Sequence, residues 1–305
     1  MESLRIQPRP PYSLERTIGA FARFPEELVD RVEAGTYRRL IVLQGQPVLV
    51  QVDELDPSAS NPFLRLARLS GHLPLDEAAA RVTRMLAVHE PLDELYETLA
   101  NHPTLSVLSV HLAGLRRTVD PDPVEGLVSS VLAQLISIRG AAVIRARVVR
   151  RFGTSVTLDD QEYWSFPQAD ALAGSSVDEL CSIGMTRAKA NAILAIAAAA
   201  LTGELDLEQL ERESDETIRT HLISLPGIGP WTADWFLVNV MGRMRVVPSG
   251  DLGIRRSTGN WLLGGRMPSP DEVRDLYDPF GEHRAYVAYY VLSAERLGIQ
   301  PPSNP

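Results

Sequence analysis

The sequence predicts an α+β chain, in which a small mixed α/β domain over residues 1–92 precedes a larger all-α region over residues 93–305. Two observations predict this organisation. Strand-like runs are confined to the N-terminal part, whereas helix-like runs follow one another from about Asp93 onward. The 305 residues are enough for two or three units of ordinary domain size, so each region can bury a core.

The N-terminal region contains a predicted β-hairpin and a predicted helix. Two β-rich runs over residues 37–52 are separated by Gln44-Gly45-Gln46-Pro47, a combination typical of a hairpin turn. The next periodic stretch, residues 74–89, has the sequence PLDEAAARVTRMLAVH and the spacing of an amphipathic helix. These two elements give the first domain its α/β character.

The remaining predicted elements are helices with recognisable start and stop residues. An Asp-Pro-Asp-Pro sequence precedes the first of the longer helices, and Gly153 and Gly203 end two others. The predicted helices cover residues 123–137, 139–153, 186–203, 251–263, 269–280 and 284–298, and two more flank a Leu-Pro-Gly-Ile-Gly turn at 225–229. The larger region is therefore expected to be a helical assembly.

The composition indicates a folded protein without disulfide or iron–sulfur chemistry. The single cysteine, Cys181, cannot form an intramolecular disulfide or ligate a cysteine-bound cluster, so a cytoplasmic location is expected. No apolar run is long enough to span a bilayer, which predicts no membrane contact. The net charge of −9 argues weakly against a nucleic-acid partner, although arginines cluster at 139–151 and 243–256.

The stretch LPGIGPWTADWF, residues 225–236, places a glycine- and proline-rich turn directly before a helix. One interpretation is an ordinary tight turn, because proline suits the first turn of a helix. The other is an anion site, because free N–H groups at a helix start bind phosphate where glycines allow close approach. A dinucleotide fingerprint is excluded, since it would need glycine at Thr232. Helix, turn and helix have the layout of a helix-hairpin-helix, with amides near Gly227 and Gly229 offered to a DNA phosphate.

Asp251 ends the loop VVPSGD and stands where the next helix should start. A structural interpretation is a helix cap, because aspartate is among the best N-cap residues. A functional interpretation uses the same physics, because the start of a helix stabilises a negative charge. A carboxylate held in this way beside a nucleic-acid site can stabilise an oxocarbenium ion. The residues alone leave both interpretations open.

The L-P-G-I-G and V-P-x-G-D motifs together resemble the helix-hairpin-helix–Gly/Pro/Asp superfamily of DNA glycosylases. The stretches SSVLAQLIS at 129–137, ELCSIGMTRAKANAI at 179–193 and RAYVAYYVL at 284–292 are similar in order and spacing to its 3-methyladenine DNA glycosylase II (AlkA-like) branch. The resemblance implies a TBP-like N-terminal domain and two helical subdomains. It also implies a cleft between residues 116–230 on one side and residues 93–115 and 248–305 on the other.

The same resemblance implies roles for individual residues. Asp251 matches the catalytic aspartate of the superfamily. Positions that match the base pocket are Trp231, Trp235, Tyr290 and Leu292, and positions that match the DNA contacts are Gln134, Leu135, Ser137, Gly227, Ile228 and Gly229. The backbone carbonyls of Ile223, Leu225 and Ile228 match a site for a monovalent cation, Na⁺ or K⁺, and no other cofactor is expected.

Several of these positions also have structural interpretations or depart from the family pattern. Leu135, the expected wedge in the duplex, lies in an apolar helix and is also consistent with core packing. Trp231 and Trp235 are four residues apart, a spacing that core packing produces as well. Leu292 stands where the alkylbase enzymes have tryptophan, and Leu252 stands where an aromatic residue is expected. The pocket is therefore expected to be less aromatic, which leaves the range of lesions open.

The expected function is monofunctional excision of alkylated purines, of the 3-methyladenine and 7-methylguanine type, from double-stranded DNA containing damaged bases. The resemblance implies base flipping and aspartate-assisted hydrolysis of the N-glycosidic bond, and the chain is expected to be a monomer. Trp231 occupies the position of the nucleophilic lysine of bifunctional relatives, and Lys189, the single lysine, is expected on a solvated helix face. Two alternatives remain: a non-catalytic DNA-binding or damage-recognition protein, and a glycosylase for deaminated or oxidised bases.

Overall fold

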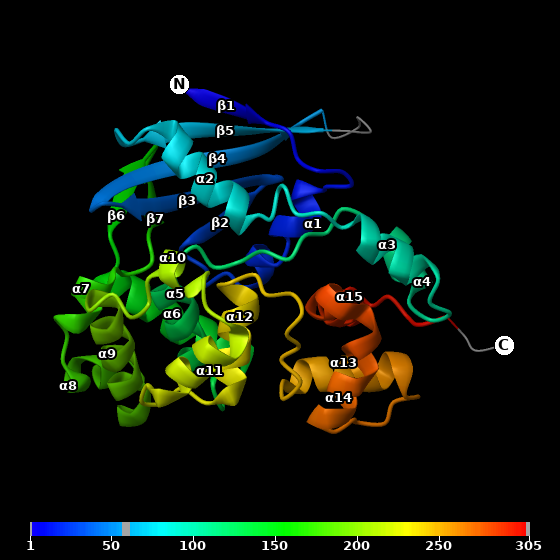
Figure 1. Cartoon of the computed structure of the whole chain (residues 1–305). Coiled ribbons are helices and arrows are strands. Elements are labelled where there is room, and N and C mark those ends of the chain that lie inside the picture. Colours follow the sequence, from blue (N-terminus) through cyan, green and yellow to red (C-terminus); the bar gives the residue numbers. More distant parts are fainter. Residues whose placement is uncertain (1, 57–61, 303–305) are drawn as a thin grey trace.

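The computed structural model describes residues 2–56 and 62–302 of the chain. Figure 1 shows an N-terminal sheet, in blue and cyan, over a group of green and yellow helices, with a second helix group beside it. The second group combines helices from the middle and the end of the chain: α3 (Asp93–Ala100), α4 (Ser106–His111), α13 (Leu252–Leu262), α14 (Pro270–Tyr277), a 3₁₀ segment η2 (Asp278–His283) and α15 (Arg284–Arg296). The chain therefore completes the first helix group before it returns to the second.

The N-terminal domain is a five-stranded antiparallel sheet in the order β1-β5-β4-β3-β2. Its elements are β1 (Ser3–Ile6), α1 (Leu14–Ile18), a 3₁₀ turn η1 (Phe21–Arg23), β2 (Asp30–Glu33), β3 (Thr36–Leu43), β4 (Gln46–Leu55), β5 (Phe63–Ser70) and α2 (Leu75–Met85). The predicted hairpin is confirmed as β3 and β4, because Gln44 and Gly45 have φ of 51° and 74°, as a tight hairpin turn requires. The predicted helix is confirmed as α2, whose apolar face packs on the sheet.

The first helix group surrounds a single hydrophobic core that includes Leu127, Ile193 and Phe236. Its helices are α5 (Pro123–Ala133), α6 (Ile138–Phe152), α7 (Ala169–Ala173), α8 (Val177–Ser182), α9 (Arg187–Leu201), α10 (Leu207–Leu210), α11 (Asp215–Ser224) and α12 (Pro230–Asn239). Asp122 caps α5 with its side chain and proline occupies the first turn, so the Asp-Pro-Asp-Pro start signal is confirmed. No helix in the described part of the chain is long and apolar enough to cross a membrane.

A short β-hairpin interrupts the region that was predicted to be all-α. Its strands are β6 (Ser155–Leu158) and β7 (Gln161–Trp164), joined by two aspartates with positive φ. Tyr163 of β7 packs against Leu40 and Leu49 of the N-terminal sheet. The prediction was wrong here because strands of four residues give too short an alternation to be recognised, and their stability comes from contact with a distant sheet.

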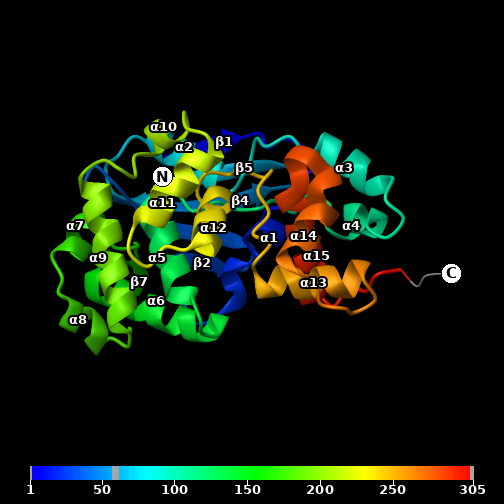
Figure 2. The ribbon, with the colours of Figure 1, turned by 60° about the horizontal axis from the view of Figure 1, so that its bottom comes forward.

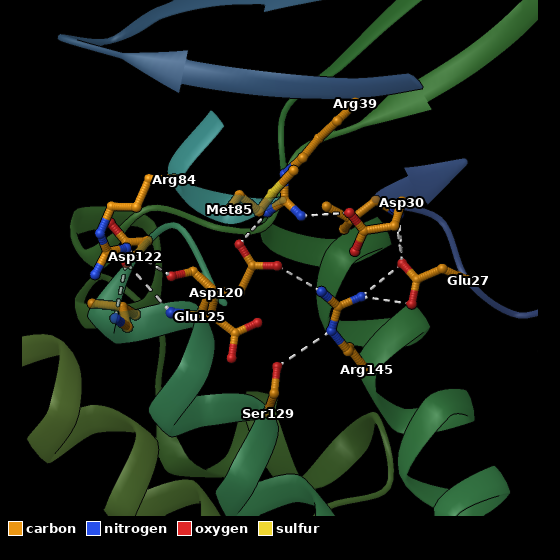
Figure 3. Close-up of polar contacts among 12 residues, drawn as sticks. Glu27, Asp30, Arg39, Arg84, Met85, Asp120, Asp122, Glu125, Ser129 and Arg145 are labelled. Atoms are coloured by element: carbon orange, nitrogen blue, oxygen red, sulfur yellow. Dashed lines mark hydrogen bonds and ion pairs between the residues drawn. The ribbon is translucent and has the colours of Figure 1, made fainter. Parts of the chain in front are cut away.

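A buried network of charged side chains joins the N-terminal sheet to the first helix group (Figure 3). Arg39 of β3 forms an ion pair with Asp30 at 2.6 Å and a second one with Glu125 of α5. Arg145 of α6 donates to Glu125 and to Glu27, both at 2.7 Å. Removing one partner would leave an uncompensated buried charge, which is strongly destabilising. The network therefore anchors the sheet on α5, the helix that leads into the cleft.

Candidate active site

Figure 2 shows the two helix groups side by side, with α5, α11 and α12 in one and α13, α14 and α15 in the other. A large cleft is lined by residues of both groups. Its volume is about 1320 Å³, more than the roughly 300–1,000 Å³ of small-ligand pockets. The lining comes from both groups, and Arg23 of the N-terminal domain also contributes to it. A cleft of this size and composition suits a segment of a macromolecule better than a small ligand.

Asp251 occupies the N-cap of α13 and lines the cleft at the same time. Its Oδ1 accepts hydrogen bonds from the N–H groups of Gly253 at 2.8 Å and Ile254 at 3.0 Å. Its Oδ2 accepts a hydrogen bond from Nε1 of Trp231 at 3.2 Å. The structural and functional interpretations of Asp251 are therefore compatible, because one oxygen caps the helix and the other is directed toward the tryptophan of the cleft.

Of the four side chains expected in the base pocket, three line the cleft. Trp231 and Trp235 on α12 form an edge-to-face pair with ring centroids 6.3 Å apart, and both belong to the lining. Leu292 of α15 adds an apolar side chain opposite them. Tyr290 does not, because it is fully buried and its hydroxyl donates to the carbonyl of Leu115 at 2.8 Å. The prediction that Tyr290 lines the pocket was wrong. Tyr290 and Leu292 are two residues apart on α15, and residues at this spacing point to different sides of a helix.

The turn between α5 and α6 presents Leu135 to solvent. Leu135 is 103% exposed and has φ of 59°, so the core interpretation is wrong. Strain of this kind in a non-glycine residue points to a functional constraint. Gln134 ties the turn to the hairpin, because its Nε2 donates to the carbonyl of Gly227 at 3.1 Å and to Oγ1 of Thr232 at 3.0 Å. Ser137 follows as the N-cap of α6 and also lines the cleft.

Lys189 supports the same turn rather than a solvated helix face, which corrects the prediction. Its Nζ donates to the backbone carbonyls of Leu132 and Gln134, both at 2.8 Å. These are the otherwise free carbonyls at the end of α5, so the ammonium group caps that helix. Burial lowers the pKa of Lys189, but two carbonyl acceptors favour the protonated form.

The Leu-Pro-Gly-Ile-Gly hairpin uses its two glycines differently. Gly227 has φ of 79°, and a Cβ there would lie 2.6 Å from Cβ of Ala192, so the fold itself requires glycine. Gly229 has φ of −107°, and a Cβ there would meet nothing within 4 Å. Ile228 is buried in the core, so only its backbone is available to a ligand. The open space at Gly229, at the start of α12, is where an anion can approach the helix.

Several residues of the cleft were not found by sequence reasoning. They include the partly exposed Asp120 and Asn239, the buried Gly126, and three arginines, Arg23, Arg256 and Arg296. Arg117 lies behind the lining, with its guanidinium 5.2 Å from the ring of Trp235 and 4.8 Å from that of Tyr289. Asp120 did give a signal: of the two aspartates in the Asp-Pro-Asp-Pro sequence only Asp122 is needed to cap α5, which leaves the other free. Among the described residues no group of three His, Cys, Asp or Glu side chains is placed to hold a metal ion.

Comparison with known proteins agrees with this geometry. A model of the HhH-GPD superfamily base excision DNA repair protein matches residues 128–280. A DNA-3-methyladenine glycosylase of Bacillus subtilis is 26% identical over 281 residues, which cover 92% of this chain and 93% of the relative. DNA-3-methyladenine glycosylase 2 of Escherichia coli is 27% identical over 298 residues, 96% of this chain and 97% of the relative.

The solved structure of a 3-methyladenine DNA glycosylase from Archaeoglobus fulgidus superposes with a TM-score of 0.82 at 26% identity, over 98% of this chain and 99% of that one. An 8-oxoguanine glycosylase/lyase from Clostridium acetobutylicum shares the fold, with a TM-score of 0.72 at 16% identity over 95% of both chains. The family match spans half of the sequence and contains both the hairpin and the Asp251 loop. This chain belongs to the HhH-GPD superfamily of base excision DNA repair proteins.

Proposed function

We propose that the chain is a monofunctional DNA N-glycosylase that excises alkylated purines from double-stranded DNA and acts as a monomer. The observation that carries the proposal is the position of Asp251, whose Oδ2 accepts from the indole of Trp231 inside the cleft. Full-length similarity to proteins named DNA-3-methyladenine glycosylase supports the substrate class. All groups that the reaction needs come from one chain, which supports action as a monomer.

Each part of the cleft has a task in this proposal. A base in a duplex must be flipped out at a cost of a few kcal/mol, which is smaller for a damaged base. Stacking on an aromatic ring returns about 1–3 kcal/mol, and a cationic purine gains a further cation–π term on Trp231. The glycosidic bond of such a purine is already weakened. The carboxylate of Asp251 then stabilises the sugar cation that forms, and water completes the hydrolysis.

The outer part of the cleft positions the DNA. Leu135 fills the gap that the extruded base leaves, as apolar wedges do between base steps. The N–H groups near Gly229 receive a phosphate, which fixes the position of the duplex without reading its sequence. Arg23 and Arg296 line the cleft and supply local positive charge that the net charge of −9 conceals, whereas the lining residue Arg256 is already ion-paired with Glu295 at 2.9 Å.

We also propose that catalysis needs no cofactor and that the hairpin binds a monovalent cation. The carbonyls of Ile223 and Ile228 accept no backbone hydrogen bond from any residue that the structure describes. The carbonyl of Leu225 accepts one, from the N–H of Ile228 at 3.2 Å, which leaves its second lone pair available. Three carbonyl oxygens suit a hard cation such as Na⁺ or K⁺, which would hold the turn and favour an approaching phosphate.

A panel of duplexes with single defined lesions tests the function. Release of 3-methyladenine and 7-methylguanine by the wild-type protein supports the proposal, and binding without release of any base supports the DNA-binding alternative instead. Exclusive release of oxidised or deaminated bases would contradict the substrate class. Borohydride added during turnover should trap no covalent adduct, because an indole cannot form an imine and the ammonium of Lys189 is held by two carbonyls.

A further inference from the structure

Asp120 places a second carboxyl group on the wall of the cleft, and none of the residues that the structure describes pairs with its side chain. Its backbone is fixed, because its N–H donates to the carbonyl of Asn239 at 2.6 Å. Its carboxylate accepts no hydrogen bond and forms no ion pair within residues 2–56 and 62–302, whereas Glu125 next to it is held by Arg39 and Arg145 (Figure 3). The carboxylate is partly exposed to the cleft, so water fills its hydrogen-bonding capacity in the free protein and a ligand that enters the cleft can take the place of that water.

The position of Asp120 follows from the geometry of α12. Trp231, Trp235 and Asn239 are spaced four residues apart, lie on one face of the helix and all line the cleft. Asp251 contacts the first of them, and Asp120 is bonded to the backbone of the last. The two carboxyl groups therefore mark opposite ends of a row that is two helical turns, about 12 Å, long.

Gly126 makes room for this arrangement. A Cβ at Gly126 would lie 2.3 Å from Cγ2 of Val240 and 3.1 Å from Oδ2 of Asp120. Any side chain at this position would push α5 away from the end of α12 and displace the carboxyl group. The close approach of the two helices thus holds Asp120 at the inner end of the cleft.

We propose that Asp120 is a specificity-determining residue that selects positively charged bases by contacting the far edge of the flipped base. This inference rests on the proposed function, because it requires a base in the cleft. A base that lies along the row from Trp231 to Asn239 has its glycosidic bond near Asp251 and its opposite edge near Asp120. A purine methylated on a ring nitrogen is a cation, and its exocyclic amine donates to a carboxylate with the strength of a charge-assisted hydrogen bond. A neutral base without such a donor leaves a recessed charge unpaired, which is costly.

The surroundings of Asp120 keep it close to the balance between acid and carboxylate at neutral pH. Burial, with the negative charge of Glu125 as a smaller contribution, raises the pKa of Asp120 to about 7, although Arg145 and Arg39 oppose the shift. The charged groups that face it are Glu125 of α5, Arg145 of α6, Arg39 of β3, Asp30 of β2, Arg84 of α2 and Arg117 before α5. A cationic base favours the carboxylate form and so lowers this pKa back toward its ordinary value, whereas a neutral base does not.

The test compares the release of two lesions by the wild-type protein and by Asp120→Asn. One lesion is 3-methyladenine, whose charge comes from methylation and persists at every pH used. The other is 1,N6-ethenoadenine, which is neutral in this range and has no exocyclic N–H donor. The quantity compared is the kcat/KM for 3-methyladenine divided by the kcat/KM for 1,N6-ethenoadenine. Because both reactions use Asp251, this ratio removes the pH dependence of Asp251 and isolates the effect of Asp120.

In the wild type the ratio should increase as the pH is raised from about 6 to about 8, with a midpoint near 7. In Asp120→Asn the ratio at about pH 8 should be roughly tenfold lower, the loss expected for one hydrogen bond to a charged group, and its rise with pH should disappear. Asp122→Asn is the matched control, because it makes the same exchange two residues away at a helix cap that asparagine also serves. Its ratio should follow that of the wild type.

A wild-type ratio that does not rise with pH, or an unchanged ratio in Asp120→Asn, would overturn the role of Asp120 while release of 3-methyladenine leaves the proposed function standing. Absence of any 3-methyladenine release by the wild type would overturn both. The pH profile uses the unaltered protein, so the proposal stays testable if the variant folds poorly. Asp120→Ser, which removes the charge and most of the side chain, should lower the ratio at least as much as Asp120→Asn.

Discussion

The mouth and the floor of the cleft are built in different ways. At the mouth, Asp251 receives three hydrogen bonds and Gln134 makes two, so these groups are paired before any DNA arrives. At the inner end, which we call the floor, the indole N–H of Trp235 is buried without a hydrogen-bond partner among the described residues, and the partly exposed carboxylate of Asp120 accepts no hydrogen bond from them. In the proposed function, the mouth is preorganised for the reaction, as electrostatic catalysis requires, and in the proposed role of Asp120 the floor is completed by the base that binds there.

Replacing Asp251 at the mouth of the cleft should have the strongest effect of the substitutions considered. Asp251→Asn should lower base excision by about a hundredfold or more, because the amide removes the negative charge that stabilises the sugar cation. Asparagine is as good an N-cap as aspartate, so the melting temperature should stay close to that of the wild type. Single-turnover excision and thermal melting measure the two effects.

Asp206→Asn provides the matched control for Asp251→Asn. Asp206 caps α10 by accepting from the N–H of Gln209, and it does not line the cleft. The control should keep wild-type excision. If Asp251→Asn also kept wild-type excision, or lost activity only together with its fold, Asp251 would be a helix cap alone.

The wedge is the next test of the mouth. Leu135→Ala should weaken binding to DNA that carries an abasic-site analogue by about tenfold, because a buried leucine side chain contributes roughly 1.5–3 kcal/mol. The melting temperature should not change, since Leu135 is 103% exposed in the free protein. Val110→Ala removes a side chain that is 73% exposed on α4 and serves as the control. Unchanged affinity combined with a lower melting temperature would restore the core interpretation.

The two hairpin glycines allow fold and binding to be separated. Gly229→Ala should leave the melting temperature unchanged but weaken binding severalfold to all DNA sequences alike, because the added methyl group occupies the open space that a phosphate enters. Gly227→Ala should instead lower the melting temperature, because of its positive φ and the contact with Ala192. Weaker binding of Gly229→Ala to lesion-bearing DNA only would show that this position contacts the lesion and not the backbone.

The same contrast explains what the sequence could and could not predict. Two parts of the mouth were predictable from short motifs, namely the turn before α12 and the cap before α13. The turn after α5 followed only from the family resemblance, because residues 123–137 were predicted as one helix, whereas α5 ends at Ala133 and α6 begins at Ile138. Asp120 was missed because its environment is made by Asn239, over a hundred residues away, and by side chains of the N-terminal sheet. Lys189 was misplaced for the same reason, since the carbonyls that it binds belong to a different helix. The local pattern marked Asp120 only as an aspartate that the cap of α5 does not need, and it carried no information about these distant partners.

Asp120 should also have a weak effect on the pH dependence of the stability of the free protein. Because the pKa of Asp120 is raised to about 7 in the folded protein from an ordinary value of 3.8, the folded state binds the proton more tightly than the unfolded state does. The stability that this proton contributes is fully present below about pH 4 and is lost as the pH rises to about 7. Asp120→Asn has no such proton to lose. The melting temperature of the variant minus that of the wild type should therefore increase between these two pH values and remain constant above about pH 7.

The size of this gain is limited because the carboxyl group is partly exposed to water in the cleft. We expect the difference in melting temperature between Asp120→Asn and the wild type to change by roughly 2–4 °C, which corresponds to about 1 kcal/mol of stability. Thermal melting of both proteins across the pH range measures it, with Asp122→Asn as the control for the chemical exchange. A difference in melting temperature that stays constant with pH would mean that Asp120 is ionised at the floor even without a ligand. The floor would then be as preorganised as the mouth, and the selection of charged bases would not depend on pH.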